Sequence, residues 1–179
     1  MRIPPTTRWR NGVVECFLLE PQHVTDVYVG WLNDPEINRF LESRFVVQNI
    51  DSVRAFVTAQ LADGHALFLG IRGVELGRHV GNIKLAPINL QHGLGEVGIM
   101  IGDRQAWGKG IGSEAIRCVA EIAKVELGLR KLTAGCYASN LGSSRAFEKA
   151  GFHIEGIRPH HFLLDGRPED LVLMARLLV

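Results

Sequence analysis

Three glycines stand at alternate positions immediately before a helical pattern, in the segment Gly108-Lys109-Gly110-Ile111-Gly112. The first amides of a helix have no partner inside the helix and carry a partial positive charge. Glycine lets an anionic group approach that backbone closely. The spacing therefore predicts a cradle for a phosphate or pyrophosphate group, although the same glycines would also suit a strand-to-helix turn that binds nothing.

Two familiar phosphate-binding patterns do not fit this segment. A nucleoside triphosphate loop has a Ser or Thr directly after Gly-Lys, and here Gly110 follows Lys109. A dinucleotide-binding fold needs Gly-x-Gly-x-x-Gly after the first strand of a parallel unit. This segment instead reads Gly-x-Gly-x-Gly and follows several expected strands. The pyrophosphate of coenzyme A is the third candidate ligand.

Hydrophobic spacing predicts the elements that position the cradle. Over residues 111–124, apolar and charged residues each recur every three or four positions, so they form opposite faces of a helix. This is the clearest helix pattern in the chain. Apolar runs predict strands over residues 13–19, 66–71, 79–85, 95–101, 131–137, 152–157 and 171–177. The strands over 66–101 lie close together in the sequence, so we expect an antiparallel meander there.

Further helices are expected on both sides of the meander. Residues 24–33 predict a short helix, and a second helical piece is expected over residues 36–41. Asp51 or Ser52 is expected to cap a helix whose apolar face includes Val53, Phe56, Val57 and Leu61. Asn140 is expected to cap a helix over residues 143–150 that ends at Gly151, and Asp165-Gly166 predicts a hairpin turn.

This order of elements predicts an α/β fold with a mixed, mostly antiparallel central sheet flanked by helices. The 179 residues are expected to form one domain over positions 1–179, with the first dozen residues as a loose arm or edge segment. A hydrophobic fraction of 46% and a charged fraction of 22% are typical of a soluble globular protein.

The net charge of +1 provides no broad field that favours nucleic acid. No stretch approaches the roughly 20 apolar residues that span a bilayer, and the N-terminus lacks the apolar run of a signal peptide.

The scattered cysteines Cys16, Cys118 and Cys136 suit buried free thiols in a reducing compartment. We expect a cytoplasmic monomer or homodimer with no membrane and no direct nucleic-acid partner.

The histidines do not favour a metal site. His160 and His161 are adjacent, so in a strand their side chains point to opposite faces. No Cys/His spacing fits zinc. We therefore expect no bound metal.

Three segments together resemble the GNAT acetyltransferase superfamily: residues 96–101, residues 107–115 and residues 140–152. The resemblance extends over residues 13–177 and is strongest to the branch that includes the ribosomal-protein N-terminal alanine and serine acetyltransferases. Residues 31–36 and the late Glu155, Asp165 and Asp170 also resemble that branch.

The resemblance implies acetyl-CoA as donor and a primary amine as acceptor, either a protein N-terminus or a small molecule. It implies that the cradle backbone holds the pyrophosphate, that the strand at residues 99–101 pairs with pantetheine and that Asn140 bonds the pantetheine arm. The cofactor-binding residues expected on this basis are Ile99, Met100, Ile101, Trp107, Gly108, Lys109, Gly110, Ile111, Gly112, Ser113, Asn140, Ser143 and Phe147.

Acetyl transfer needs a neutral amine, a donor for the oxyanion and a stabiliser for the departing thiolate. Glu96, at the start of the strand that leads to the cradle, is the candidate base, acting directly or through water; similar family members place an acid there. The resemblance places Ser143 opposite the sulfur, with Ser144 as the near alternative. The Tyr that the family often has seven residues after the Asn is Phe147 here, so no residue is an obvious general acid.

Two alternatives remain at this point. One alternative acceptor is an amino sugar or another small amine, and Trp31, Asp34, Glu36 and Arg39 fall where the family has its acceptor-side helices. The missing Tyr also leaves open a non-catalytic module that binds acyl-CoA.

Overall fold

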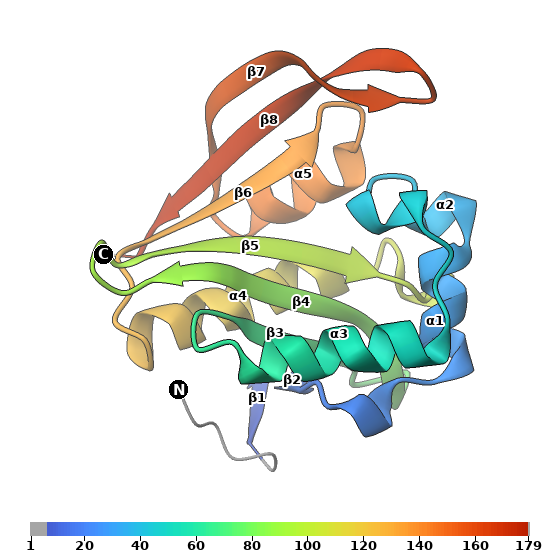
Figure 1. Cartoon of the computed structure of the whole chain (residues 1–179). Helices are drawn as coiled ribbons and strands as arrows, with labels where there is room; N and C mark the ends of the chain where they lie inside the picture. Colours follow the sequence, from blue (N-terminus) through green and yellow to red (C-terminus); the bar gives the residue numbers. More distant parts are fainter. Residues whose placement is uncertain (1–6, 179) are drawn as a thin grey trace.

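The computed structural model describes residues 7–178, which form one eight-stranded sheet in the order β1-β2-β3-β4-β5-β6-β8-β7 (Figure 1). Every neighbouring pair is antiparallel except β5 and β6, which are parallel. The predicted fold class and the meander of β3, β4 and β5 are therefore confirmed. The strands are β1 (Arg8–Asn11), β2 (Val14–Leu18), β3 (Leu67–Gly73), β4 (Arg78–Asn89), β5 (Leu94–Ile101), β6 (Lys131–Tyr137), β7 (His153–Leu164) and β8 (Arg167–Leu177).

Helices cover both faces of the sheet. On one face, α1 (Asp26–Asn33), α2 (Pro35–Asn38) and α3 (Ile50–Ala62) pack against an apolar cluster that includes Trp31. On the other face, α4 (Ile111–Val125) and α5 (Leu141–Lys149) belong to the larger core (Figure 1). Short 3-10 turns occur at η1 (Pro21–His23), η2 (Glu42–Phe45) and η3 (Arg104–Ala106).

The sheet splits between β5 and β6. The two strands are paired only from Leu94 with Lys131 to Glu96 with Thr133. Beyond that point β5 continues along β4 as far as the pair of Ile101 with Gly81, whereas β6 continues along β8 (Figure 1). The last five residues of β5 therefore have a strand partner on one side only, and their outer backbone groups face the gap.

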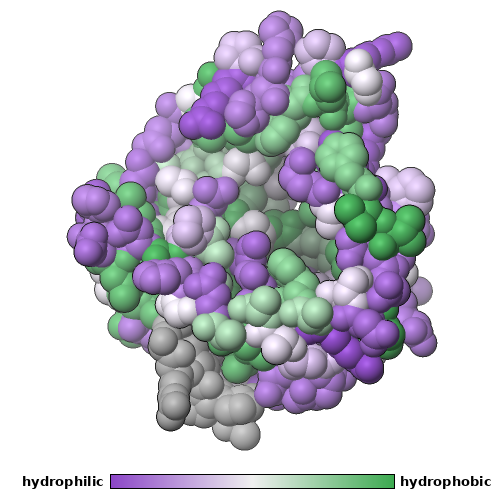
Figure 2. Space-filling model, in the orientation of Figure 1, coloured by the Kyte–Doolittle hydropathy of each residue, from purple (hydrophilic) through white to green (hydrophobic). Residues whose placement is uncertain are grey.

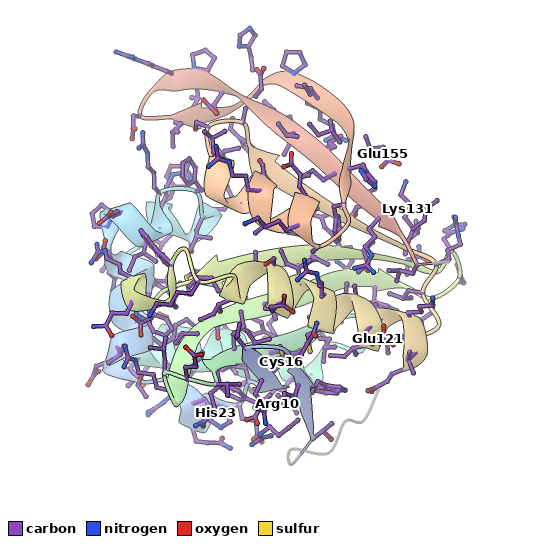
Figure 3. All side chains as sticks on the ribbon, turned by 180° about the vertical axis from the view of Figure 1, so that it is seen from behind. Arg10, Cys16, His23, Glu121, Lys131 and Glu155 are labelled. Carbon is purple, nitrogen blue, oxygen red and sulfur yellow. The ribbon has the colours of Figure 1, made fainter. Side chains whose placement is uncertain are left out.

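The amphipathic helix at the centre of the sequence is α4, as predicted. Its residues Ile111, Ala115, Val119, Ile122 and Ala123 are all buried against the sheet, because they recur every three or four positions. From behind, α4 crosses the sheet with Glu121 on its outer side, and Lys131 and Glu155 form an ion pair nearby (Figure 3).

The start of α3 differs from the prediction. Its N-cap is Asn49, whose side chain accepts a hydrogen bond from the Ser52 amide, so neither Asp51 nor Ser52 is the cap. Two hydrogen bonds of 2.8 Å join Asn33 to the Gln48 backbone and fix where the helix begins. Of α3, only Val53 and Val57 are buried, where the helix packs over β3. The predicted inward residues Phe56 and Leu61 are instead 45% and 38% exposed.

Other differences concern element lengths. The helical piece expected over residues 36–41 is only the single turn α2, because the chain bends after Asn38 and runs into η2. Of the predicted N-terminal arm, residues 8–11 form the edge strand β1, and residues 1–6 lie outside the described part. The helix that follows Asn140 spans Leu141–Lys149, and Asp165 and Gly166, both with positive φ, make the predicted turn between β7 and β8.

Candidate active site

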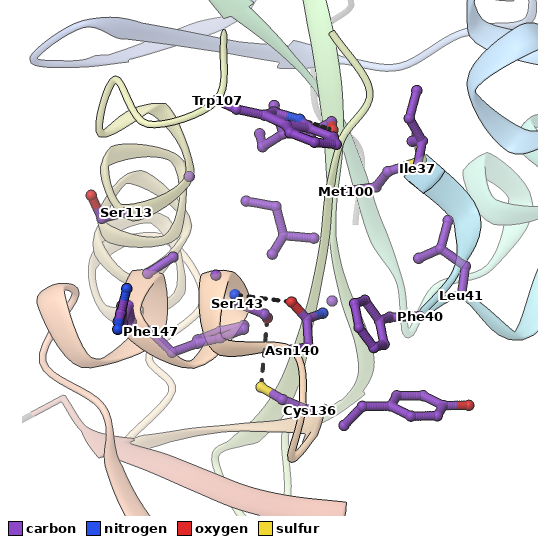
Figure 4. A pocket seen from close by; sticks show the side chains of 18 of the residues that line it. Ile37, Phe40, Leu41, Met100, Trp107, Ser113, Cys136, Asn140, Ser143 and Phe147 are labelled. Atoms are coloured by element: carbon purple, nitrogen blue, oxygen red, sulfur yellow. Dashed lines mark hydrogen bonds between the residues drawn. The ribbon is translucent and has the colours of Figure 1, made fainter. Parts of the chain in front are cut away.

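A cavity of about 830 Å³ occupies the gap between β5 and β6 and extends to the N-terminus of α4. Figure 2 shows this face of the molecule hollowed near its centre. In the close view, Ile37, Phe40 and Leu41 enter from one side, Ser113 and Phe147 lie on the other, and Trp107 lies at one end (Figure 4). The cavity thus brings together the glycine segment, the outer edge of β5 and the start of α5.

The cradle is built by two left-handed glycines. Gly108 and Gly110 have φ values of 73° and 77°, which side chains with a Cβ rarely adopt. Gly110 is the N-cap of α4, and the first amide to enter the helical ladder is that of Glu114, which donates to the Gly110 carbonyl at 3.1 Å. The amides at positions 111–113 precede that ladder and lie at the positive end of the helix. This arrangement fits a pyrophosphate.

Trp107 connects the cradle to the end of β5. Its indole Nε1 donates a hydrogen bond of 2.8 Å to the Ile101 carbonyl, and the side chain is 41% exposed at the cavity. Ser113 turns its hydroxyl back to the Gly110 carbonyl at 2.8 Å, so it stabilises the first turn of α4. Of the cofactor residues expected from the sequence, twelve line the cavity; Lys109 is exposed and does not.

The wall opposite the cradle comes from β6 and α5. Asn140 caps α5 by accepting the Ser143 amide at 3.2 Å, which confirms its predicted capping role. The Ser143 hydroxyl lies 3.5 Å from the sulfur of Cys136 (Figure 4). Burial raises the pKa of the Cys136 thiol, and hydrogen bonds from Ser143 and Ser144 oppose that rise only in part. Cys136 is therefore held as a neutral thiol, and all three cysteines are buried and free.

Two basic residues on α5 also line the cavity. Arg145 and Lys149 are four positions apart, so they occupy one face of the helix. Neither residue was predicted from the sequence, although their four-residue spacing on the helix after Asn140 places them on one face. They supply positive charge beside the cradle, as an anionic cofactor requires. Phe147, on the same helix, is 2% exposed and packs edge-on against Phe152 at 5.0 Å.

Glu96 lies at the base of the split. It is exposed, belongs to the last β5–β6 pair and is not among the residues that line the cavity. Side chains alternate along a strand, so Glu96 projects to the same face as Met100, which packs against the α1–α3 cluster. Gly98 and Gly135, two residues further along each strand, line the cavity. Glu96 thus stands next to a part of the opening where the flanking residue of each strand is a glycine.

The acceptor-side residues expected from the sequence divide into two groups. Trp31 is 7% exposed and packs in the core between Tyr28 and His79, so it does not reach the cavity. Glu36 and Arg39 do line it, paired with Arg104 at 2.7 Å and Asp165 at 3.0 Å respectively.

Asp34 caps α2 by accepting amide hydrogen bonds from the start of that helix. Burial tends to raise the pKa of Asp34, but those bonds and the Arg104 guanidinium overcome this effect and lower it. Asp34 and Arg104 therefore form a fixed ion pair at the edge of the acceptor side.

A mixed sheet that splits beside an amide-lined helix N-terminus, with a cavity joining the two, defines a coenzyme-A-dependent acyltransferase fold. The family model of the acetyltransferase (GNAT) domain matches residues 18–153. The chain therefore belongs to the GNAT acetyltransferase family, which confirms the resemblance drawn from its motifs.

Curated relatives support the same family. The probable N-acetyltransferase YjcK of Bacillus subtilis is 45% identical over 73 residues, which make up 41% of this chain and 40% of that protein. The uncharacterized N-acetyltransferase p20 of Bacillus licheniformis is 24% identical over 161 residues, covering 85% of this chain and 86% of that protein.

Solved structures share the fold. The spermidine N-acetyltransferase of Vibrio cholerae, in complex with CoA and spermine, has a TM-score of 0.83 and 21% identity over 94% of this chain and 97% of that one. The ribosomal L7/L12 alpha-N-protein acetyltransferase RimL, in complex with coenzyme A, also has a TM-score of 0.83, with 17% identity over 96% and 98% of the two chains. These neighbours act on different acceptors, so the shared fold does not determine the acceptor.

Within residues 7–178, no helix is long and apolar enough to cross a membrane. The same residues contain no group of three or more His, Cys, Asp or Glu side chains arranged to hold a metal ion.

Proposed function

We propose that this chain transfers the acetyl group of acetyl-CoA to a primary amine by direct attack in a ternary complex. The observation that supports this proposal is the single cavity that joins the cradle at α4 to the split between β5 and β6. An anionic cofactor anchored at the cradle then has room to extend along β5 towards the face where α2 lies. The acceptor is a protein N-terminus, as in the resembling branch, or a small-molecule amine.

The residues around the cavity fit coenzyme A. The amides at positions 111–113 offer donors to the pyrophosphate, and Arg145 and Lys149 add positive charge beside it. The free edge of β5 at Ile99, Met100 and Ile101 offers backbone groups to an amide-bearing arm, and Asn140 faces them from α5. When bound, acetyl-CoA supplies the activated acetyl group as a thioester.

Each chemical requirement has a candidate residue. Glu96 accepts the proton of the acceptor ammonium, directly or through water, from the face of the sheet where the acceptor enters. The amide near Met100 donates to the oxyanion. The Ser143 hydroxyl donates to the departing sulfur; in the structure it lies 3.5 Å from the sulfur of Cys136. Phe147 has no proton to give, so the acid role usually ascribed to Tyr at this position passes to Ser143 or water.

Direct transfer is favoured over an acyl-enzyme. Cys136 is the cysteine that lines the cavity, and its side-chain partners are the hydroxyls of Ser143 and Ser144, not a base. A neutral thiol without a base is a poor nucleophile.

The test is a screen of primary amines with acetyl-CoA, following thiol release and confirming the acetylated product by mass spectrometry. We expect saturable thiol release that requires an amine, with intersecting initial-velocity lines when both substrates are varied. Saturable coenzyme A binding without turnover on any amine would instead identify a non-catalytic acyl-CoA-binding module. Parallel initial-velocity lines would indicate an acyl-enzyme and contradict the direct mechanism.

A further inference from the structure

On the acceptor side, the cavity is bounded by residues that no cofactor role explains. Phe40 and Glu42 come from the segment after α2, Tyr137 ends β6, and Phe162 lies on β7. All four line the same cavity as the cradle and the split. We refer to these four residues as the acceptor wall.

Three rings make the acceptor wall apolar. Tyr137 and Phe162 are stacked with centroids 4.2 Å apart and planes 12° from parallel, and Tyr137 is 4% exposed, so Phe162 and Phe40 supply most of the ring surface that faces the cavity. Phe40 lies 5.6 Å from Tyr137 at a tilt of 52°. The Arg44 and Arg39 guanidiniums already lie 5.3 and 5.6 Å from the Tyr137 and Phe40 centroids. Aromatic rings bind another ring in offset-stacked or edge-on geometry and attract an adjacent cation.

One accessible carboxylate adjoins the rings. Glu42 accepts a hydrogen bond of 2.5 Å from the Tyr137 hydroxyl, and its side chain remains 65% exposed, so it has lone pairs left for an ammonium. Arg44 forms an ion pair of 3.4 Å with the same Glu42 oxygen, Oε1, and also donates to the carbonyls of Leu41 and Leu163. Those two bonds hold the Arg44 guanidinium in place behind the wall.

The charges of the cavity do not suit a polycation. Its two lining carboxylates are Glu36 and Glu42, and each is paired with an arginine, Glu36 with Arg104 at 2.7 Å and Glu42 with Arg44 at 3.4 Å. Of the lining cations, Arg145 and Lys149 lie beside the cradle, and Arg39 lies on the acceptor side. Glu42 is the lining carboxylate that contacts the rings, and one such carboxylate suits a single ammonium.

Contacts across the acceptor end also limit acceptor size. Arg39 pairs with Asp165 at 3.0 Å, and Arg44 donates to the Leu163 carbonyl at 3.1 Å. These bonds join the segment after α2 to the β7–β8 hairpin beside the wall. A protein acceptor would have to displace them, whereas a small molecule would not.

We propose that the acceptor is a small monoamine that also contains a ring, with its ammonium on Glu42 and its ring against Phe40, Tyr137 and Phe162. This inference rests on the proposed acetyl transfer and narrows its acceptor to a chemical class. It assigns Glu42 to ammonium binding.

The test compares kcat/KM for two ring amines, 2-phenylethylamine and D-glucosamine, with that for two chain amines, n-butylamine and spermidine, at saturating acetyl-CoA. We expect at least one ring amine to exceed both chain amines by about tenfold. Equal or better use of butylamine or spermidine would overturn the inference while leaving acetyl transfer intact. Coenzyme A binding with no thiol release from any amine would overturn both the proposed function and this inference.

Two variants test the wall itself. Glu42→Gln keeps an acceptor for the Tyr137 hydroxyl but removes the charge, and should raise KM for the preferred ring amine about tenfold. Phe162→Leu should erase most of the preference for ring over chain amines. Coenzyme A affinity should not change in either variant, which a titration checks together with folding.

The matched controls lie outside the cavity. Glu148→Gln removes an exposed carboxylate from α5, and Phe56→Leu removes a half-exposed ring from α3; both should retain the parental KM. If Glu42→Gln and Phe162→Leu fold, bind coenzyme A and keep the parental KM and preference, the acceptor wall does not bind the acceptor.

Discussion

Glu96 on β5 is the register partner of Thr133 on β6, and this is the last parallel pair before the two strands separate. The pairing places an exposed carboxylate at the base of the split, on the face of the sheet that also carries Met100 and the α1–α3 cluster. Two residues further along, Gly98 and Gly135 line the cavity and have no side chains of their own. For this reason we propose Glu96 as the base that takes the proton of an amine in the gap, directly or through water.

Glu96→Gln should lower kcat by about 10²- to 10⁴-fold, the usual contribution of a general base, without changing coenzyme A affinity. Steady-state kinetics and calorimetric titration measure both effects. Glu75→Gln, an exposed carboxylate in the turn between β3 and β4, is the control and should behave as the parent. An unchanged kcat would remove Glu96 from the mechanism.

Gly110→Glu should abolish coenzyme A binding, because it places a negative side chain at the N-cap of α4, where the pyrophosphate is expected. Gly77→Glu is a matched control, since Gly77 also has positive φ, at 65°, and lies in the β3–β4 turn with no atom near its missing Cβ. Both changes cost roughly 1–2 kcal/mol of stability through the left-handed backbone. Calorimetric titration should show at least tenfold weaker coenzyme A binding in Gly110→Glu alone; equal affinities would mean that the cradle holds no phosphate.

Asn140 should have two separable roles. Asn140→Ala loses the bond to the Ser143 amide and should cost about 1 kcal/mol in unfolding free energy, as well as weakening coenzyme A binding. Asn140→Ser restores a capping oxygen on a shorter side chain, so stability should return while affinity stays low. Thermal melts and calorimetric titration separate the two. If Asn140→Ser recovers both the stability and the coenzyme A affinity of the parent, Asn140 acts only as a helix cap.

Ser143→Ala should lower kcat about tenfold and leave coenzyme A affinity intact, because the hydroxyl is expected to bond the sulfur only as negative charge develops there. Ser144→Ala is the neighbouring control: the Ser144 hydroxyl bonds the Asn140 carbonyl at 3.4 Å and should matter little. Single-turnover rates with the best amine from the screen compare the two. A larger loss of rate in Ser144→Ala than in Ser143→Ala would mean that Ser144, not Ser143, bonds the departing sulfur.

Local patterns made much of this architecture predictable. The buried stripe of α4 and the cap at Asn140 depend on residues three or four positions apart, and the turn at Asp165-Gly166 depends on adjacent residues. Each was predicted from its spacing. The cradle was found in the same way, because Gly108 and Gly110 directly precede the helix that they begin.

The acceptor side was not predictable, because its contacts join distant parts of the chain. The bond between Glu42 and Tyr137 spans 95 positions, and that between Arg39 and Asp165 spans 126. No spacing rule links such residues before the sheet order is known. The exposure of Phe56 has the same origin, since only the placement of α3 over β3 decides which of its apolar residues is buried.

His79 should make the folded state sensitive to acid. The centroid of its ring lies 5.2 to 5.9 Å from those of Phe17, Tyr28 and Trp31. Its Nε2 lies 2.8 Å from the Gly81 carbonyl oxygen and 2.9 Å from Oδ1 of Asn82. Burial in this apolar cluster lowers the pKa of His79 by more than its two hydrogen bonds raise it. The folded chain therefore binds a proton at His79 less readily than the unfolded chain, whose histidines titrate near pH 6.5.

Because the unfolded state takes up more protons in this range, the contribution of His79 is fully present above about pH 6.5 and is lost as the pH falls towards the lowered pKa. Melting temperatures from pH 7.5 to 5 should fall less steeply in His79→Gln than in the parent. His92→Gln, an exposed histidine in the turn between β4 and β5, should retain the parental slope. His23 also has a pKa lowered by burial, so the double variant His23→Gln/His79→Gln should flatten the curve further. A parental slope in His79→Gln would mean that His79 does not resist protonation in the folded chain.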